Sequence, residues 1–147
     1  MKKEHLEYLV EIGIKKIIKE RIEEIYQFYL ELCPEEIDDL FVTDYIKEDD
    51  SRVYEKLTFY SKNYVLTAHD FQYNDAFSVI NRNTRKPYGF TIKKKDYDFK
   101  KATTKSRMTI TIGYINKYVT ILKASKENCD YLKRIFEKKY KPLVIDA

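Results

Sequence analysis

Apolar residues recur at steps of three and four along the first part of the chain, which is the spacing of one buried face of an α-helix. The pattern covers residues 3–32, and its main apolar positions are Leu6, Val10, Ile14, Ile18, Ile22, Ile25, Tyr29 and Leu32. An unbroken helix of about 30 residues would be about 45 Å long, which exceeds a compact domain of this size. We therefore expect either a break near Gly13 or a helical hairpin that turns near Cys33 and Pro34. An unbroken helix would instead project and pair with a partner chain.

Pro34 ends this pattern and can open another helix, because proline is suited to the first helical turn. Residues 34–41, with the sequence PEEIDDLF, are accordingly predicted to form one short helix. The segment DYIKEDDSR at residues 44–52 has the polar and acidic composition of a loop. We therefore expect the chain to be helical up to about residue 45.

The period of the apolar positions changes to two from residue 53 onward, which predicts β-strands. The expected strands cover residues 53–60, 63–69, 76–81, 88–94, 107–114 and 117–123, with a weaker strand at 96–100. The alternation is clearest at Ile110 and Ile112, because Thr111 between them points to the opposite face. Short links at Ser61–Lys62 and Ile115–Asn116 favour hairpins, so the sheet should be largely antiparallel.

A second helical pattern covers residues 126–140, where Ser125 is suited to be the N-cap and Pro142 to stop the helix. Its buried stripe is predicted to consist of Leu132, Ile135, Phe136 and Tyr140. We therefore expect a single α+β domain over residues 1–147. A helical N-terminal segment (1–45) would precede a curved antiparallel sheet or small barrel of six to seven strands with a C-terminal helix (52–142).

The strand run that ends in MTITIGYINKYVTIL, followed by the helix SKENCDYLKRIFEKKY, resembles a pleckstrin-homology-like domain. The resemblance covers residues 52–142 and lies in the order of the elements. It implies a small barrel closed by a helix, and prokaryotic members of this family generally act as scaffolds or binding modules. The chain differs in two ways from the eukaryotic members of this family. Its C-terminal helix lacks the tryptophan that they usually have, and its first hairpin has only Lys56 and Lys62 where they have a basic phosphoinositide-binding motif. A phosphoinositide site is therefore not implied.

The composition favours a folded cytoplasmic protein. The chain has 147 residues, of which 44% are hydrophobic, and can form a core without disulfides or metals. No apolar run approaches the roughly 20 residues of a membrane span, and acidic residues interrupt the N-terminal segment where a signal peptide would be apolar. Cys33 and Cys129 are expected to be reduced thiols, and no cofactor or metal site is predicted. The excess of 22 Lys over 6 Arg is typical of an A+T-rich microbial genome.

The charges are distributed unevenly along the chain. Residues 82–107 hold ten Lys or Arg and two Asp, whereas residues 31–50 hold nine acidic residues and one Lys, and the net charge is +4. The possible anion-binding residues are Arg82, Arg85, Lys93, Lys94, Lys95, Lys100 and Lys101. Near Tyr88, Phe90, Tyr97 and Phe99, these cations could bind single-stranded nucleic acid or a membrane surface. If Tyr88, Phe90 and Ile92 face the core, however, the lysines form a solvated strand end, or they dock on the acidic segment.

No stretch carries a specific catalytic motif. His69 and Asp70 are neighbours in a strand, so their side chains should point to opposite faces, and His5 is expected on the surface. Asp98-Phe99-Lys100, with Asp70 or Asp75, has the residue types of a metal-dependent nuclease. The acidic group Asp38, Asp39, Asp44, Glu48, Asp49 and Asp50 lacks the spacing of a calcium loop and is predicted to be solvated.

These observations favour a non-catalytic binding or scaffold module that acts through protein contacts. The N-terminal helical stripe is a candidate surface for self-association. A protein that binds nucleic acid or another anionic surface through residues 82–107 is the alternative, and a metal-dependent nuclease is the third hypothesis.

Overall fold

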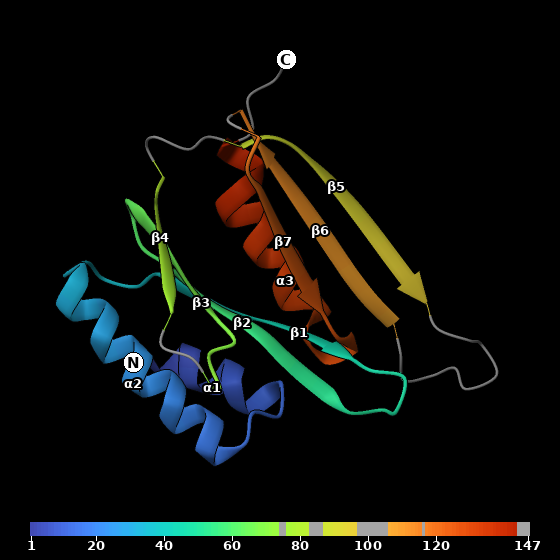
Figure 1. Ribbon diagram of the computed structural model, residues 1–147, viewed down its shortest axis with the longest axis horizontal. Coiled ribbons are helices and arrows are strands. Elements are labelled where there is room, and N and C mark those ends of the chain that lie inside the picture. Colours follow the sequence, from blue (N-terminus) through green and yellow to red (C-terminus); the bar gives the residue numbers. More distant parts are fainter. Residues whose placement is uncertain (74–75, 83–86, 97–105, 116, 144–147) are drawn as a thin grey trace.

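The computed structural model describes residues 1–73, 76–82, 87–115 except 97–105, and 117–143, with only the backbone of residues 88, 92–96, 106 and 107 (Figure 1). The helices are α1 (Lys3–Glu11), α2 (Lys16–Leu32) and α3 (Cys129–Ile135). The strands are β1 (Asp39–Ile46), β2 (Arg52–Tyr60), β3 (Tyr64–His69), β4 (Phe77–Asn81), β5 (Pro87–Asp96), β6 (Ser106–Tyr114) and β7 (Val119–Ala124). The fold is therefore α+β, as predicted.

The helical N-terminal segment breaks at Gly13, as the sequence predicts. Gly13 has a φ of 77°, a left-handed conformation that other residues rarely adopt. Its N–H donates to the carbonyl of Val10 at 3.0 Å, and the N–H of Ile14 donates to the carbonyl of Leu9 at 3.0 Å. This pair of bonds is a Schellman motif, which satisfies the last carbonyls of α1. The alternative of a helical hairpin near Cys33 and Pro34 is wrong, because the chain passes from α2 into a strand.

The short helix predicted at residues 34–41 is wrong, and strand β1 also takes the first part of the loop predicted at 44–52, of which residues 47–51 form the turn before β2. Five consecutive residues of β1, from Leu40 to Asp44, are buried. A strand that is buried on both faces does not alternate between apolar and polar residues, so it lacks the period of two that identifies a half-buried strand. Three aspartates in and beside β1 also made the strand harder to recognise from the sequence, because Asp is depleted in strands.

The strands form two antiparallel sheets. One has the order β1-β2-β3-β4 and the other β5-β6-β7, and the described residues do not close them into a barrel. Strand β7 lies beside β1, and α3 packs against β1, β6 and β7 (Figure 1). Helices α1 and α2 lie at the side of the β1–β4 sheet (Figure 1). Side chains from the helices and both sheets form one core cluster.

The six strands predicted from residue 53 onward are confirmed, with boundaries shifted by a few residues. The hairpins β2–β3 and β6–β7 are also confirmed. Strand β5 continues through Lys93, Lys94 and Lys95, whose backbones pair with Thr109, Met108 and Arg107. The predicted weak strand lies outside the described residues apart from Asp96, the last residue of β5. Cys33 and Cys129 form no disulfide.

The C-terminal helix is a continuous run of different helical turns. A 3-10 turn (η1, Lys126–Asn128) precedes α3, and a π-helical turn (η2, Phe136–Tyr140) and a second 3-10 turn (η3, Lys141–Leu143) follow it. The predicted buried stripe is confirmed, and the Phe136 ring packs edge-on against Phe90 at 4.5 Å. The hydroxyl of Ser125 does not cap this helix, because it donates to Asp44 instead.

Asp44 is fully buried at the centre of a hydrogen-bond network, although the sequence predicted it to be solvated. One carboxylate oxygen accepts bonds from the hydroxyl of Ser125 at 2.7 Å and from the Nε of Arg52 at 2.6 Å. The other accepts from the backbone N–H of Ser125 at 2.8 Å and from the amide of Asn128 at 2.9 Å. A buried carboxylate is tolerated because it is paired with a cation and its acceptor sites are filled.

The same network closes the free edge of β1. The N–H of Val42 donates to the Tyr8 hydroxyl at 3.0 Å, and that hydroxyl donates to the side-chain oxygen of Asn128 at 2.7 Å. The amide of Asn128 donates to the carbonyl of Val42 at 2.6 Å. Arg52 extends the network to the turn after α1, where its guanidinium donates to the carbonyl of Ile12. Tyr8 and Asn128 therefore take the place of a neighbouring strand.

Replacing Asp44 by Ala is expected to destabilise the fold strongly. The substitution leaves Arg52 without its carboxylate and leaves the bonds of Ser125 and Asn128 unmade, at a cost of about 3–5 kcal/mol. Urea unfolding followed by circular dichroism measures this loss. Asp49→Ala, in the exposed β1–β2 turn, is the matched control and should change the unfolding midpoint far less. Equal stability of the Asp44→Ala protein and the wild type would contradict the central role of this carboxylate.

Candidate functional site

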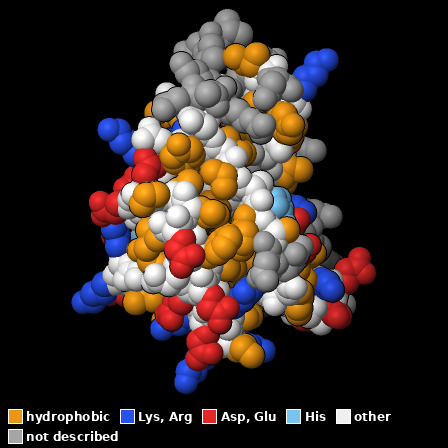
Figure 2. Space-filling view, turned by 60° about the vertical axis from the view of Figure 1, so that its left-hand side comes forward, with side chains coloured by type: hydrophobic (Ala, Val, Ile, Leu, Met, Phe, Trp, Pro, Cys, Tyr) orange, Lys and Arg blue, Asp and Glu red, His pale blue; other side chains and the backbone are white. Residues whose placement is uncertain are grey.

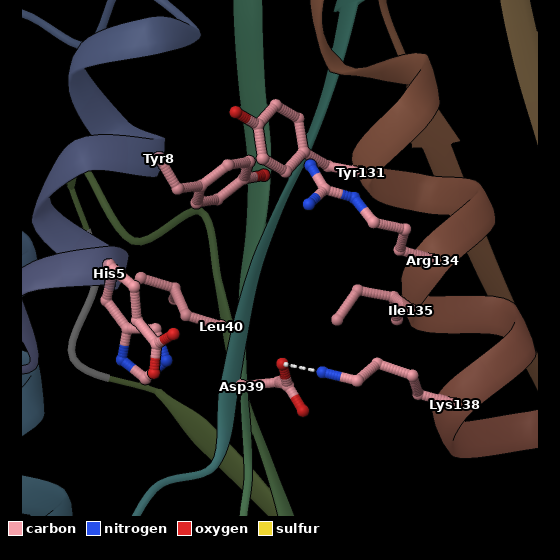
Figure 3. A pocket seen from close by; sticks show the side chains of 9 residues that line it. His5, Tyr8, Asp39, Leu40, Tyr131, Arg134, Ile135 and Lys138 are labelled. Carbon is pink, nitrogen blue, oxygen red and sulfur yellow. Dashed lines mark hydrogen bonds and ion pairs between the residues drawn. The ribbon is translucent and has the colours of Figure 1, made fainter.

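A cavity of about 150 Å³ lies between α1, β1 and α3 (Figure 3). We call it the α1–α3 cavity. The residues that line it are Glu4, His5, Tyr8, Asp39, Leu40, Tyr131, Arg134, Ile135 and Lys138. Figure 3 shows His5 and Tyr8 projecting from α1 on one side, and on the other Tyr131, Arg134 and Ile135 from α3 with Lys138 from the η2 turn that continues it. The cavity thus brings together residues that are more than 120 positions apart in sequence.

The aromatic part of the cavity is held rigidly. The rings of Tyr8 and Tyr131 lie 4.4 Å apart at an angle of 55°. Tyr8 also stacks on Phe41 at 6.5 Å, and its hydroxyl is bonded to Val42 and Asn128. Burial raises the pKa of Tyr8, so its hydroxyl stays protonated. Tyr8 therefore acts as a fixed wall of the cavity.

Arg134 is the cation on the α3 wall that has no anionic partner among the residues that the structure describes. Its guanidinium carbon lies 4.3 Å from the centroid of the Tyr131 ring, a cation–π contact that holds the side chain in place. Within the described residues, Arg134 makes no ion pair and no hydrogen bond through its side chain. Its planar set of N–H donors is thus free for a carboxylate or another oxyanion.

Asp39 contributes little negative charge to the cavity, because two lysines bind it. Lys138 lies 3.2 Å from one carboxylate oxygen, and Lys139 lies 2.8 Å from the other. Burial by itself would raise the pKa of Asp39, but the hydrogen bonds and charges of the two lysines outweigh it and lower the pKa. Asp39 therefore stays ionised and neutralised by its neighbours.

His5 is buried, with 6% of its surface exposed, so the prediction that it lies on the surface is wrong. Its ring nitrogen Nε2 donates to the carbonyl of Asp38 at 3.1 Å, which ties α1 to the start of β1. Burial lowers the pKa of His5, although the bond to Asp38 and the charges of Glu4 and Asp39 act in the opposite direction. The helical period alone did not show that this face of α1 packs on the sheet.

The cavity is small, and the two side chains in it that could transfer a proton already have hydrogen-bond partners. Small-molecule and cofactor pockets typically measure roughly 300–1,000 Å³, which is larger than this cavity. The hydroxyl of Tyr8 and the Nε2 of His5 are both engaged in structural hydrogen bonds. Among the residues that the structure describes, no three His, Cys, Asp or Glu side chains gather to hold a metal ion.

The residues predicted to bind an anion do not include any residue of this cavity. The guanidinium of Arg82 donates to the carbonyls of Ser61 at 3.1 Å and Lys139 at 3.4 Å, so it serves the fold. Arg85, Lys100 and Lys101 lie outside the described residues, as do the side chains of Lys93, Lys94 and Lys95. The predicted binding of nucleic acid by residues 82–107 therefore stays a prediction.

The other candidate residues do not form a site within the described part of the chain. His69 is exposed, and its Nε2 lies 3.3 Å from the hydroxyl of Ser78. Asp70 is exposed in the turn after β3 and has a φ of 48°. The predicted nuclease triplet at residues 98–100 and Asp75 lie outside the described residues. Arg134 was missed because it stands on the polar face of its helix, where a solvated cation is the ordinary expectation.

The comparisons with known proteins do not identify a family. No family model and no curated protein matches the chain. A search of solved structures finds the C-terminal domain of an unknown protein from Leishmania infantum, with a TM-score of 0.46 and 12% identity. That match covers 80% of this chain and 96% of the other. No helix in the described ranges has the length and apolar character needed to span a membrane.

The buried His5 predicts a loss of stability at mildly acidic pH. Because its folded-state pKa is below the ordinary value of about 6.5, the unfolded chain binds the proton more tightly. The free energy of unfolding should therefore fall as the pH falls below about 6.5. Urea unfolding at pH values from about 7.5 to about 5.5 should show a smaller fall for His5→Gln than for the wild type. The control His69→Gln should keep the wild-type slope, and an unchanged slope in His5→Gln would contradict the assignment.

Proposed function

We propose that the chain is a non-catalytic protein-binding module and that the α1–α3 cavity receives one side chain of its partner. The observation that carries this proposal is the position of Arg134. Its guanidinium lines a small cavity, is held by the Tyr131 ring, and has no anionic partner within the described residues. A cation in this state is prepared to meet a group from another molecule.

The size of the cavity supports a side chain as its occupant. A volume of about 150 Å³ is comparable to that of a protein cavity that holds one benzene molecule. Leu40 and Ile135 provide aliphatic contact, while charged groups lie around them, which is the mixture of apolar and polar groups typical of recognition sites. One inserted side chain of this kind can act as the anchor of a larger contact surface.

The order of the elements supports a resemblance to pleckstrin-homology-like binding modules. A four-stranded and a three-stranded antiparallel sheet precede a single C-terminal helix. With β1 included, the resemblance would begin at Asp39 instead of residue 52. Helices α1 and α2 then form an addition before the first strand, and α1 supplies one wall of the α1–α3 cavity.

Self-association through α2 is the second form of protein contact that we propose. Ile22, Ile25 and Tyr29 of the predicted helical stripe are buried in the chain's own core. Three other apolar residues of α2 are exposed, Ile17 to 74%, Leu32 to 52% and Phe28 to 40%. Figure 2 shows the side of the molecule that carries α2 and β4, where hydrophobic side chains gather among charged ones. Because the other apolar residues of α2 are buried or half-buried, this exposed surface is the part of the helix that could contact a second copy of the chain.

Selection from a displayed random-peptide library tests whether the α1–α3 cavity binds proteins. We expect peptides that shift the amide signals of residues around the cavity, such as Leu40, Tyr131 and Ile135, in a ¹⁵N-labelled sample. We expect no shifts at the β6–β7 hairpin near Ile115. Peptides that map only to other surfaces, or no enrichment above background, would refute this function for the cavity.

Matched variants on α3 connect the binding to Arg134. Arg134→Ala should lower the affinity for the selected peptides, because it removes the cation and its stacked contact with the cavity wall. Lys133→Ala removes an exposed cation from the adjacent position, which does not line the cavity, and should leave the affinity unchanged. Equal weakening by both substitutions would indicate a general effect of charge and contradict a specific role of the cavity.

A further inference from the structure

The α1–α3 cavity has a charge arrangement that distinguishes among possible side chains. Arg134 on α3 and Lys138 on the following η2 turn stand four residues apart in one helical run, and both line the cavity. Lys139 lies against the other oxygen of Asp39, so this carboxylate keeps one cation even if Lys138 turns away from it. The α3 wall can therefore present two positive groups to an incoming anion.

The opposite wall carries one opposing charge, Glu4 on α1. Glu4 is exposed and makes no ion pair or hydrogen bond within the described residues. The charged residues that line the cavity are Arg134 and Lys138 against Asp39 and Glu4, so their charges balance, and Lys139 beside them is shared between Asp39 and Asp38. Because both lining cations lie on the α3 side and Asp39 keeps Lys139, an anionic group should bind there and not near α1.

From this arrangement we infer that the α1–α3 cavity binds the carboxylate of a Glu or Asp side chain from an acidic segment of a partner protein. The planar guanidinium of Arg134 can donate two parallel hydrogen bonds to a carboxylate, and Lys138 can donate a third. Leu40 and Ile135 would contact the aliphatic stem of the acidic side chain. The inference rests on the proposed protein-binding function, and it adds the chemical class of the occupant.

The probe for this inference is N-acetyl-glutamate amide, a capped single residue, with N-acetyl-glutamine amide as its neutral counterpart of nearly equal shape. Titration into ¹⁵N-labelled protein should shift the signals around the cavity with the glutamate probe only. The glutamate affinity should fall about tenfold or more in Arg134→Ala, because a hydrogen-bonded charge pair is lost. It should fall less in Arg134→Lys, which keeps the charge but loses the planar fork.

A substitution on the α1 wall should change the affinity for the glutamate probe in the opposite direction to Arg134→Ala. Glu4→Gln removes the opposing negative charge from an exposed position, so it should tighten the binding of the glutamate probe and leave the glutamine probe unaffected. A variant that merely disturbed the fold could not improve binding. The affinity for the glutamate probe should also fall as salt is added, since the cavity is open to solvent.

Several outcomes would overturn the inference. No shift with the glutamate probe at its highest soluble concentration, equal binding of the two probes, or an unchanged affinity in Arg134→Ala would each exclude a carboxylate as the occupant. If selected peptides bind at the cavity but contain no Glu or Asp, this inference fails while the proposed protein-binding function stands. If the selected peptides bind elsewhere and the glutamate probe still binds at the cavity, the proposed function fails.

Discussion

The buried carboxylate of Asp44 is the point at which the parts of this fold are joined. It lies on β1, its cation comes from β2, and its other donors come from the junction of β7 with the C-terminal helix. Asn128 continues the bonds to Tyr8 on α1. A charge removed from water requires such a complete set of partners, so the position of each element is constrained by the others. Strands β1 and β2, helix α1 and the start of the C-terminal helix are thereby held in one arrangement.

The candidate site depends on this arrangement because its walls belong to different elements. Tyr8 has two roles: its hydroxyl belongs to the network, and its ring forms a wall of the α1–α3 cavity. The distance between α1 and α3 is therefore set by buried bonds and not by the side chains at the mouth of the cavity. Arg134 takes no part in this network and has no anionic partner within the described residues. The residues of the network and the proposed binding residue are thus neighbours but not the same.

The sequence predicted what is encoded locally. The break at Gly13, six strands and the buried stripe of the C-terminal helix each follow from a period or a single conformational preference. Strand β1 could not be recognised, because burial on both faces removes the alternation on which the prediction relies. Asp44 resembled its exposed acidic neighbours, since its partners Ser125 and Asn128 lie 81 and 84 residues away. Arg134 likewise could not be identified, because only the fold places α1 opposite it.

The closure of the β1 edge has a consequence for biosynthesis. The bond between Tyr8 and Asn128 spans 120 residues, so a nascent chain emerges from the ribosome with the edge of β1 uncovered until the C-terminal helix is made. During that interval the C=O of Val42 lacks its Asn128 partner and is available to any other extended segment. Long-range closure of this kind also slows folding. The helix that follows all seven strands in the sequence is therefore the one that protects the first strand from pairing with the wrong chain.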